Sequence, residues 1–172
     1  MGNFFLVCGV SGGGKTILTK RILEKNSDLD LIMLDVDEYY AKINGDERNR
    51  DNFFEVWITL WKDLHQYEIE GKNVILTTNS LTRSQRDQFI EWFPTYKHHC
   101  LWVMADKDKC FEGNKNRYRN VPEDKLEKMW QRMEFPSAKE DYWDSIAFIT
   151  NWWTDTYTVF DIVGNIRTLL NI

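Results

Sequence analysis

The chain has 172 residues, of which 42% are hydrophobic, and its formal net charge is −5. This length is enough for one domain with a sizeable core, so we expect a single domain over residues 1–172. No run of about 18 apolar residues occurs, and we expect no membrane-spanning segment. The lack of a strongly basic composition argues against tight, non-specific binding of polyanions, although it leaves room for a local basic cleft.

The N-terminus and the cysteines indicate a cytoplasmic protein. The first apolar run has no basic segment before it and ends in a glycine-rich loop, so we do not expect a signal peptide. Cys8, Cys100 and Cys110 form an odd set without the spacing of metal ligands. Cys8 and Cys100 stand in strand-like runs, where we expect reduced thiols in the core.

Helical and strand-like segments alternate along the chain, a pattern typical of an α/β fold with a mainly parallel sheet. The first predicted strand is Asn3–Cys8. Residues 9–16 follow it directly with the sequence Gly-Val-Ser-Gly-Gly-Gly-Lys-Thr. They match the phosphate-binding P-loop pattern G-x-x-x-x-G-K-[ST]. A helix-competent segment, residues 17–23, completes the strand, loop and helix that this motif needs.

The P-loop residues have distinct physical roles in binding a nucleoside triphosphate with magnesium. Glycines let the backbone curl so that several N–H groups point at one anion, and the helix N-terminus adds partial positive charge. Lys15 would reach the β- and γ-phosphates, and the Thr16 hydroxyl would bind Mg²⁺. The residues that we expect around ATP in this stretch are Gly9, Ser11, Gly12, Gly13, Gly14, Lys15, Thr16 and Ile17.

The second predicted strand, residues 30–34, leads into two aspartates, Asp35 and Asp37. In an open α/β sheet the carboxyl ends of the strands face the ligand crevice, and residues two positions apart in an extended chain share one side. One carboxylate could accept a proton from an attacking hydroxyl, and the other could hold metal-bound water. The alternative is an acidic N-cap of a helix, since aspartate favours that position.

Six apolar residues recur at helical spacing before the third predicted strand. They are Phe53, Phe54, Trp57, Ile58, Trp61 and Leu64. We expect this stripe to face the core. The alternative is a platform on which nucleobases stack, because aromatic faces are suited to that contact.

The rest of the chain continues the alternation and brings the predicted sheet to about five strands flanked by helices. The remaining predicted strands are Asn73–Thr77, residues 97–104 and residues 145–149. The remaining predicted helices are residues 84–93, residues 122–133 and a short one that closes the tail, residues 161–170. His98 and His99 begin the fourth strand, and we expect them at an edge or at the surface.

Residues 114–120 form a polar, basic segment without an apolar stripe. Phosphoryl transfer spreads negative charge over equatorial oxygens, which planar guanidinium groups stabilise. We therefore expect a mobile lid over about residues 111–121, in which Arg117 or Arg119 supplies charge when the lid closes. The alternative is a solvated basic loop.

The order of these features resembles the phage polynucleotide kinase family of small P-loop kinases, over about residues 3–149. The similarity includes the P-loop, the Asp-Glu-Tyr after the second strand, and residues 77–82 after the third. Its more specific part comprises Asn114, Arg117, Val121, Pro122, Met129, Phe135, Pro136, Asp144, Ser145 and Ile146. The resemblance implies a P-loop kinase fold and transfer of the γ-phosphate of ATP to a hydroxyl of a nucleic acid or small molecule.

The resemblance also implies roles for single residues. By position, Asp37 matches the general base that takes the hydroxyl proton, and Arg117 matches the lid arginine that contacts the phosphates. Lys15 and Thr16 match the P-loop pair.

Three positions depart from the family. Gly113 replaces an arginine that often stands early in the lid, and Thr78 replaces an aspartate of the third strand. Tyr40 stands where polynucleotide kinases have an arginine that helps to seat the acceptor. This last change weakens the case for a 5′-hydroxyl acceptor, and Tyr40 could instead stack on a base or form a hydrogen bond to the acceptor.

We therefore expect an ATP- and Mg²⁺-dependent kinase that acts on DNA, RNA or a nucleotide, in the host cytoplasm if the chain is phage-encoded. The expected catalytic residues are Asp37, Lys15 and Arg117, and Arg117 is also expected to bind ATP. The expected metal ligands are Thr16 and Asp35. The residues expected to bind the acceptor are Asp35, Asp37, Tyr40 and Asn79.

Several alternatives stay open from the sequence. The acceptor is a polynucleotide 5′-hydroxyl, or a hydroxymethyl group on a modified base such as 5-hydroxymethyluracil. A small-molecule kinase for a nucleoside or sugar is the next alternative, followed by a nucleotide-binding ATPase that is not a kinase. The Asn-Lys-x-Asp motif of GTPases does not occur. Trp152 and Trp153 are expected to pack at the edge of the last strand, unless they are exposed and touch substrate.

Overall fold

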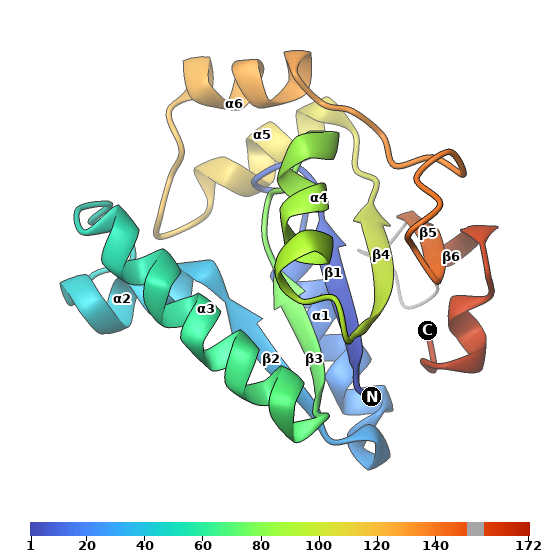
Figure 1. Ribbon diagram of the computed structural model, residues 1–172. Helices are drawn as coiled ribbons and strands as arrows, with labels where there is room; N and C mark the ends of the chain where they lie inside the picture. Colours follow the sequence, from blue (N-terminus) through green and yellow to red (C-terminus); the bar gives the residue numbers. More distant parts are fainter. Residues whose placement is uncertain (151–156) are drawn as a thin grey trace.

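The computed structural model of the chain describes residues 1–150 and 157–172, and its centre is a six-stranded sheet in the order β2-β3-β1-β4-β5-β6 (Figure 1). The strands are β1 (Asn3–Cys8), β2 (Leu31–Asp35), β3 (Asn73–Thr77), β4 (Lys97–Val103), β5 (Ser145–Thr150) and β6 (Thr158–Val163). Neighbouring strands from β1 to β5 pair in parallel, and β6 pairs antiparallel with β5. The predicted α/β fold with a mainly parallel sheet is confirmed.

The tail differs from the prediction, because it contributes a sixth strand before its short helix. Strand β6 extends to Val163, and only Ile166–Thr168 forms a short 3₁₀ helix. In β6 Val159 is buried, whereas Phe160 and Ile162 are exposed, which is the two-residue period of a strand with one covered face. Apolar residues on both faces of this strand concealed that period in the sequence. Trp152 and Trp153 lie outside the described residues.

Helices cover both faces of the sheet (Figure 1). They are α1 (Lys15–Lys25), α2 (Val36–Asn44), α3 (Phe53–Glu70), α4 (Arg83–Trp92), α5 (Lys107–Lys115) and α6 (Glu123–Gln131). In Figure 1, α3 and α4 lie in front of the sheet and α1 lies behind it, while α5 and α6 lie above the carboxyl ends of the strands. Residues that follow β1, β2 and β3 therefore meet at one edge of the sheet, below α5 and α6.

The residues of β1 alternate between two halves of the core. Phe4 and Leu6 pack in the cluster that includes buried residues of α3 and α4, whereas Phe5 and Val7 pack with Leu18 of α1. All five side chains are almost completely buried. Because β1 is a central parallel strand covered on both faces, its sequence is a continuous apolar run. Its position inside the sheet places the loop that follows it near the middle of the sheet edge.

Helix α3 buries only part of the predicted stripe, in which Leu64 faces the core as expected. Its fully buried residues are Val56, Leu60 and Leu64. Phe53, Phe54 and Ile58 are 53%, 79% and 47% exposed, so the prediction that they face the core is wrong. Trp57 and Trp61 are half-buried and pack only partly against the core cluster. The helix thus has two apolar faces, and the aromatic one is turned toward a cavity.

The two neighbouring histidines of β4 are buried rather than at an edge, because β4 lies between β1 and β5. The His99 ring makes hydrogen bonds with Oγ of Ser145 (2.9 Å) and with Oδ1 of Asn3 (3.0 Å). Burial lowers the pKa of His99 to about 4, and it also lowers the pKa of His98. Both side chains are therefore neutral at physiological pH.

Two expectations from composition agree with the structure. Cys8 and Cys100 are free and buried, as expected for reduced thiols in the core, and Cys110 is free and buried as well. Over the residues that the structure describes, no helix is both long enough and apolar enough to cross a membrane.

Candidate active site

The P-loop begins at Gly9, directly after β1, and packs against α5. Gly12 and Gly14 have φ angles of +81° and +85°, a left-handed conformation that favours glycine. A Cβ on Gly12 would lie 2.1 Å from the carbonyl oxygen of Cys110, and a Cβ on Gly113 would lie 2.6 Å from the carbonyl oxygen of Gly12. Both sides of the contact therefore require glycine.

Lys15 lies inside the curl of the P-loop. Its Nζ donates hydrogen bonds to the carbonyl oxygens of Gly9 (2.9 Å) and Val10 (3.1 Å). It also donates to Oδ1 of Asn79 (3.1 Å), which follows β3. Burial lowers the pKa of Lys15 to about 8. Asn79, expected at the acceptor, thus contacts the P-loop lysine in this structure, and Ser11 donates to the same oxygen.

Thr16 and Asp35 form an oxygen pair beside the P-loop. The Thr16 hydroxyl donates to Oδ2 of Asp35 (3.0 Å), and the other carboxylate oxygen accepts from the backbone N–H of Asp37 (2.9 Å). Asp35 is therefore also the N-cap of α2, which begins at Val36. The chain does not stay extended through this pair as we expected, because the helix starts between the two aspartates.

The oxygen pair fits a hard cation. Hydroxyl and carboxylate oxygens are ligands that Mg²⁺ prefers, and Mg²⁺ usually takes its remaining ligands from phosphate and water. Within the described ranges, no group of three or more His, Cys, Asp or Glu residues could hold a metal ion. A Mg²⁺ ion at Thr16 and Asp35 would therefore depend on a bound nucleotide.

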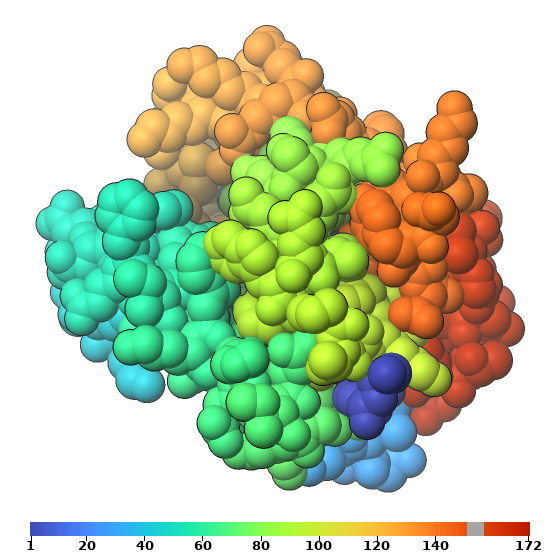
Figure 2. Space-filling view, in the orientation of Figure 1, coloured from blue at the N-terminus to red at the C-terminus, as the bar shows by residue number. Residues whose placement is uncertain are grey.

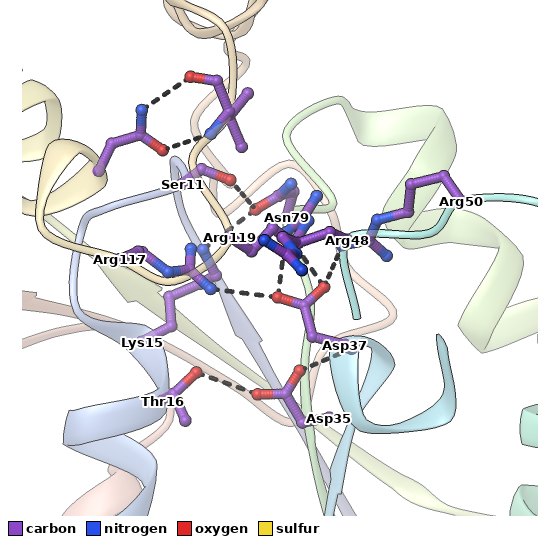
Figure 3. A network of polar contacts seen from close by, with 12 residues as sticks. Ser11, Lys15, Thr16, Asp35, Asp37, Arg48, Arg50, Asn79, Arg117 and Arg119 are labelled. Carbon is purple, nitrogen blue, oxygen red and sulfur yellow. Dashed lines mark hydrogen bonds and ion pairs between the residues drawn. The ribbon is translucent and has the colours of Figure 1, made fainter. Parts of the chain in front are cut away.

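Three arginine side chains bind the carboxylate of Asp37, which lies in the first turn of α2 (Figure 3). Arg50 donates a hydrogen bond to Oδ1, Arg117 donates to Oδ2 (3.1 Å), and Arg119 donates to both oxygens (3.0 and 3.1 Å). Burial raises the pKa of Asp37, but the hydrogen bond from Arg50 and the charges of all three arginines outweigh it. The net effect lowers the pKa. The carboxylate is held ionised at a point of concentrated positive charge.

The basic segment continues from the end of α5; Arg117 and Arg119 are partly buried, whereas Tyr118 between them is 67% exposed. Asn114, at the end of α5, bridges the loop that follows: its side chain accepts from Val121 N–H (3.0 Å) and donates to Val121 C=O (2.8 Å). It also donates to Oδ1 of Asn120 (3.0 Å). This bridge closes the intervening residues into a loop that directs Arg117 and Arg119 inward to the aspartate.

Arg50 is a site residue that the sequence did not reveal. It lies between α2 and α3, and its guanidinium carbon is 3.9 Å from the centre of the Tyr40 ring while the group also binds Asp37. Tyr40 itself is almost fully buried beneath it. A guanidinium group therefore lies beside Asp37 and over the Tyr40 ring, supplied by a residue ten positions after Tyr40. A lone arginine in a charged loop carries no sequence signal of this contact.

One cavity of about 1090 Å³ joins these groups. The predicted site residues in its lining are Ser11, Gly12, Gly14, Lys15, Thr16, Ile17, Asp35, Asp37, Tyr40, Asn79 and Arg117. Gly9 and Gly13 lie outside the lining. Thr78, which replaces the family's aspartate, also lines the cavity. Its other end lies between α3 and α4, whose side chains meet on the face shown in Figure 2.

The parallel sheet and the P-loop give the chain the fold of the small P-loop kinases. Comparison of the sequence with models of protein families identifies one family within this class. The model of the AAA domain family matches residues 4–136, which is more than half of the chain, and the chain therefore belongs to this family. The comparison with curated proteins finds no match.

Solved structures that share this fold belong to proteins with different names. A gluconokinase from Sinorhizobium meliloti 1021 is 17% identical, with 86% of this chain and 82% of that chain covered and a TM-score of 0.59. Kti12 from Chaetomium thermophilum in complex with ADP-AlF3 is 17% identical, with 89% and 90% covered and a TM-score of 0.65. A chain of the Pnkp1/Rnl/Hen1 RNA repair complex is 14% identical, with 76% and 43% covered and a TM-score of 0.65. At these identities the likeness shows the fold alone.

Proposed function

We propose that the protein transfers the γ-phosphate of ATP to a hydroxyl group of a nucleic acid or nucleotide. The position of Asp37 carries this proposal. Its carboxylate lines the same cavity as Lys15 and receives Arg117 and Arg119 from the lid. A proton acceptor, a phosphate-binding lysine and two arginines therefore meet in one place. That combination can serve transfer to a hydroxyl group, because the carboxylate can take the proton of the attacking hydroxyl while the cationic groups stabilise the transferring phosphate.

The nucleotide would be held by the P-loop side of the cavity. Backbone N–H groups of the curled loop and Lys15 would bind the phosphates, replacing the loop carbonyls and the Asn79 oxygen that Lys15 contacts now. Thr16 and Asp35 would hold Mg²⁺. When bound, Mg²⁺ neutralises charge on the phosphate oxygens.

Transfer would proceed in line. The acceptor oxygen bonds to the γ-phosphorus, the bond from that phosphorus to the β–γ bridging oxygen breaks, and ADP leaves with the electron pair. The hydroxyl proton goes to Asp37. Arg117 and Arg119 would move from Asp37 to the phosphate oxygens, where negative charge is spread over the transferring group. Their departure raises the pKa of Asp37 toward its ordinary value and makes it a better base.

The geometry around Tyr40 bears on the choice of acceptor. Because Arg50 places a guanidinium group beside Asp37 and over Tyr40, the missing arginine at position 40 no longer argues against a 5′-hydroxyl acceptor. A hydroxymethyl group on a modified base such as 5-hydroxymethyluracil is the other version of this proposal. A nucleoside or sugar kinase is the second candidate, supported by the fold that the chain shares with a gluconokinase and a sugar kinase. An ATPase without an acceptor is the third.

A transfer assay with γ-labelled ATP and magnesium tests the proposal. The acceptors are DNA with a 5′-hydroxyl, DNA with hydroxymethylated pyrimidines, RNA, free nucleosides and gluconate. We expect label on a nucleic acid or nucleotide, and no transfer by Lys15→Ala, because this variant loses the ammonium group at the phosphates. Label on gluconate alone would favour the sugar kinase, and label that appears only as free phosphate would refute a kinase of any kind.

A further inference from the structure

The aromatic side of the cavity forms one continuous wall. Phe53, Trp57 and Trp61 follow each other at intervals of four residues along α3, with 6.1 Å between the centres of successive rings. Trp92, at the end of α4, meets Trp61 edge to face with 3.7 Å between ring centres. All four residues line the cavity that contains the P-loop and Asp37. We call them the aromatic wall.

The wall lies at the border of the hydrophobic core, because Trp57 and Trp61 pack against the core cluster. Helix α3 already buries Val56, Leu60 and Leu64 completely on its core side, whereas Phe53 and Trp92 are 53% and 41% exposed. Exposed aromatic surface that is contiguous and lines a cavity marks a binding site more often than a folding requirement. The wall therefore has surface available for a ligand that enters the cavity.

Two exposed polar side chains share this cavity with the rings. Gln88 of α4 and Arg132, after α6, line the same cavity, and within the part of the chain that the structure describes their side chains have no hydrogen-bond or ion-pair partner. The indole Nε1 of Trp57 is also without a partner. An amide offers a donor and an acceptor together, which suits the edge of a nucleobase, and the guanidinium group suits a phosphate.

The wall begins at the site of transfer. Phe53 is three residues after Arg50, which binds Asp37, and the row from Phe53 to Trp61 extends about 12 Å along α3 at 1.5 Å per residue. A hydroxyl group at Asp37 would thus be joined to a base that lies against the first rings of the wall. The cavity offers no comparable row of rings on its P-loop side.

We propose that the aromatic wall of Phe53, Trp57, Trp61 and Trp92 binds the nucleobase of the acceptor by stacking. This inference rests on the proposed function and names the part of the acceptor that the protein recognises. Stacking on aromatic side chains tolerates different bases, because every base presents a π face. The wall would fix the distance from base to hydroxyl, and it would give acceptors with a base an advantage over those without one.

The test compares two probes of equal length and charge, a short oligothymidylate and an abasic oligomer, both with a free 5′-hydroxyl. Fluorescence anisotropy gives binding, and γ-labelled ATP gives KM and kcat for transfer. We expect the protein to bind the oligothymidylate at least about tenfold more tightly. Trp92→Ala should remove most of that difference, with Trp61→Ala as the second variant, while the KM for ATP stays unchanged. Trp92→Phe should restore it, because it keeps a ring.

Ile69→Ala is the matched control, since Ile69 is exposed on α3 and lies outside the cavity lining. Equal binding of both probes, or wall variants that leave the difference intact, would overturn the wall proposal and leave the transfer proposal standing. Base-dependent binding that the wall variants abolish, without transfer to any acceptor, would support the wall and refute the kinase proposal.

Discussion

In the proposed mechanism, Asp37 has two tasks that compete with each other. As a base it must release arginines that hold it ionised, and as a lid anchor it must keep them. Asp37→Asn keeps the shape and one acceptor oxygen but cannot take a proton. We expect kcat to fall by about a hundredfold or more, with the affinity for ATP retained or increased because the lid arginines are free to bind phosphate. Steady-state transfer and equilibrium ATP binding measure the two effects.

Asp35→Asn is the matched control for this prediction. Asp35 pairs with Thr16 and caps α2, so its loss should raise the Mg²⁺ concentration needed for half-maximal transfer rather than remove the base. An active Asp37→Asn protein together with an inactive Asp35→Asn protein would show that the base assignment is wrong.

At the residue scale, the sequence predicted contacts that lie within a motif and missed one that depends on the fold. Lys15 and Thr16 stand at fixed positions of the P-loop, so their neighbourhood follows from spacing alone. Arg50 reaches Asp37 only because Tyr40 lies beneath its guanidinium group, and that stacking depends on how α2 ends and α3 begins. No local pattern encodes such a contact.

At the element scale, α3 shows the limit of periodicity. Its apolar residues include both Leu64, in the core, and Phe53, in the cavity, so one broad stripe in the sequence corresponds to two faces with different functions. The periodicity of a sequence shows that a helix has a wide apolar arc on its surface. It does not show which part of that arc packs against a neighbouring helix. Here the aromatic part of the arc lines the cavity, where Trp61 meets Trp92 of α4.

The position of α4 depends on a buried ion pair. Arg86 is fully buried and binds Glu140 through Nη2 (2.8 Å) and Nε (3.3 Å), while Nη1 donates to the carbonyl oxygen of Glu134 (2.9 Å). Arg86→Met leaves the buried carboxylate without its cation. We expect the free energy of unfolding to fall by about 3–5 kcal/mol, measured by urea denaturation. Because Gln88 and Trp92 are on the same helix, oligothymidylate binding should weaken as well.

Two variants control this prediction. Arg83→Met removes an exposed ion pair with Asp87 on the same helix and should have a much smaller effect. Arg86→Met combined with Glu140→Leu removes both charges and should recover much of the lost stability, since no unpaired carboxylate remains. A double variant that is as unstable as the single one would mean that Arg86 acts through packing and not through the ion pair.

At the scale of the whole molecule, the strand alternation predicted five strands of the sheet, and the shared sheet then brought the predicted site residues to one edge. Asp35 and Asn79 are distant in sequence, yet both follow strands that end beside the P-loop. The order of the strands in the sheet could not be predicted from the sequence. For this reason His98 and His99 were expected at an edge, whereas β4 lies inside the sheet and buries them.

The burial of His99 makes the stability of the fold depend on pH. Its pKa is lowered from 6.5 to about 4 because burial disfavours the charged ring, so between these values the unfolded chain binds a proton that the folded protein does not. Stability therefore rises with pH across this window and is lost as pH falls through it. A difference of this size corresponds to about 3 kcal/mol between pH 7 and pH 4. Urea denaturation across this range measures the loss.

His99→Gln isolates this contribution, because glutamine can keep a hydrogen bond to Ser145 or Asn3 but does not titrate. We expect the variant to lose less stability than the parent between pH 7 and pH 4, while the exposed His65→Gln leaves the loss unchanged. His98 adds to the same window, since burial lowers its pKa too, so a residual slope should persist in the His99 variant. Identical slopes for the parent and His99→Gln would show that the ring is already protonated in the folded protein, which would place a buried charge in the centre of the sheet.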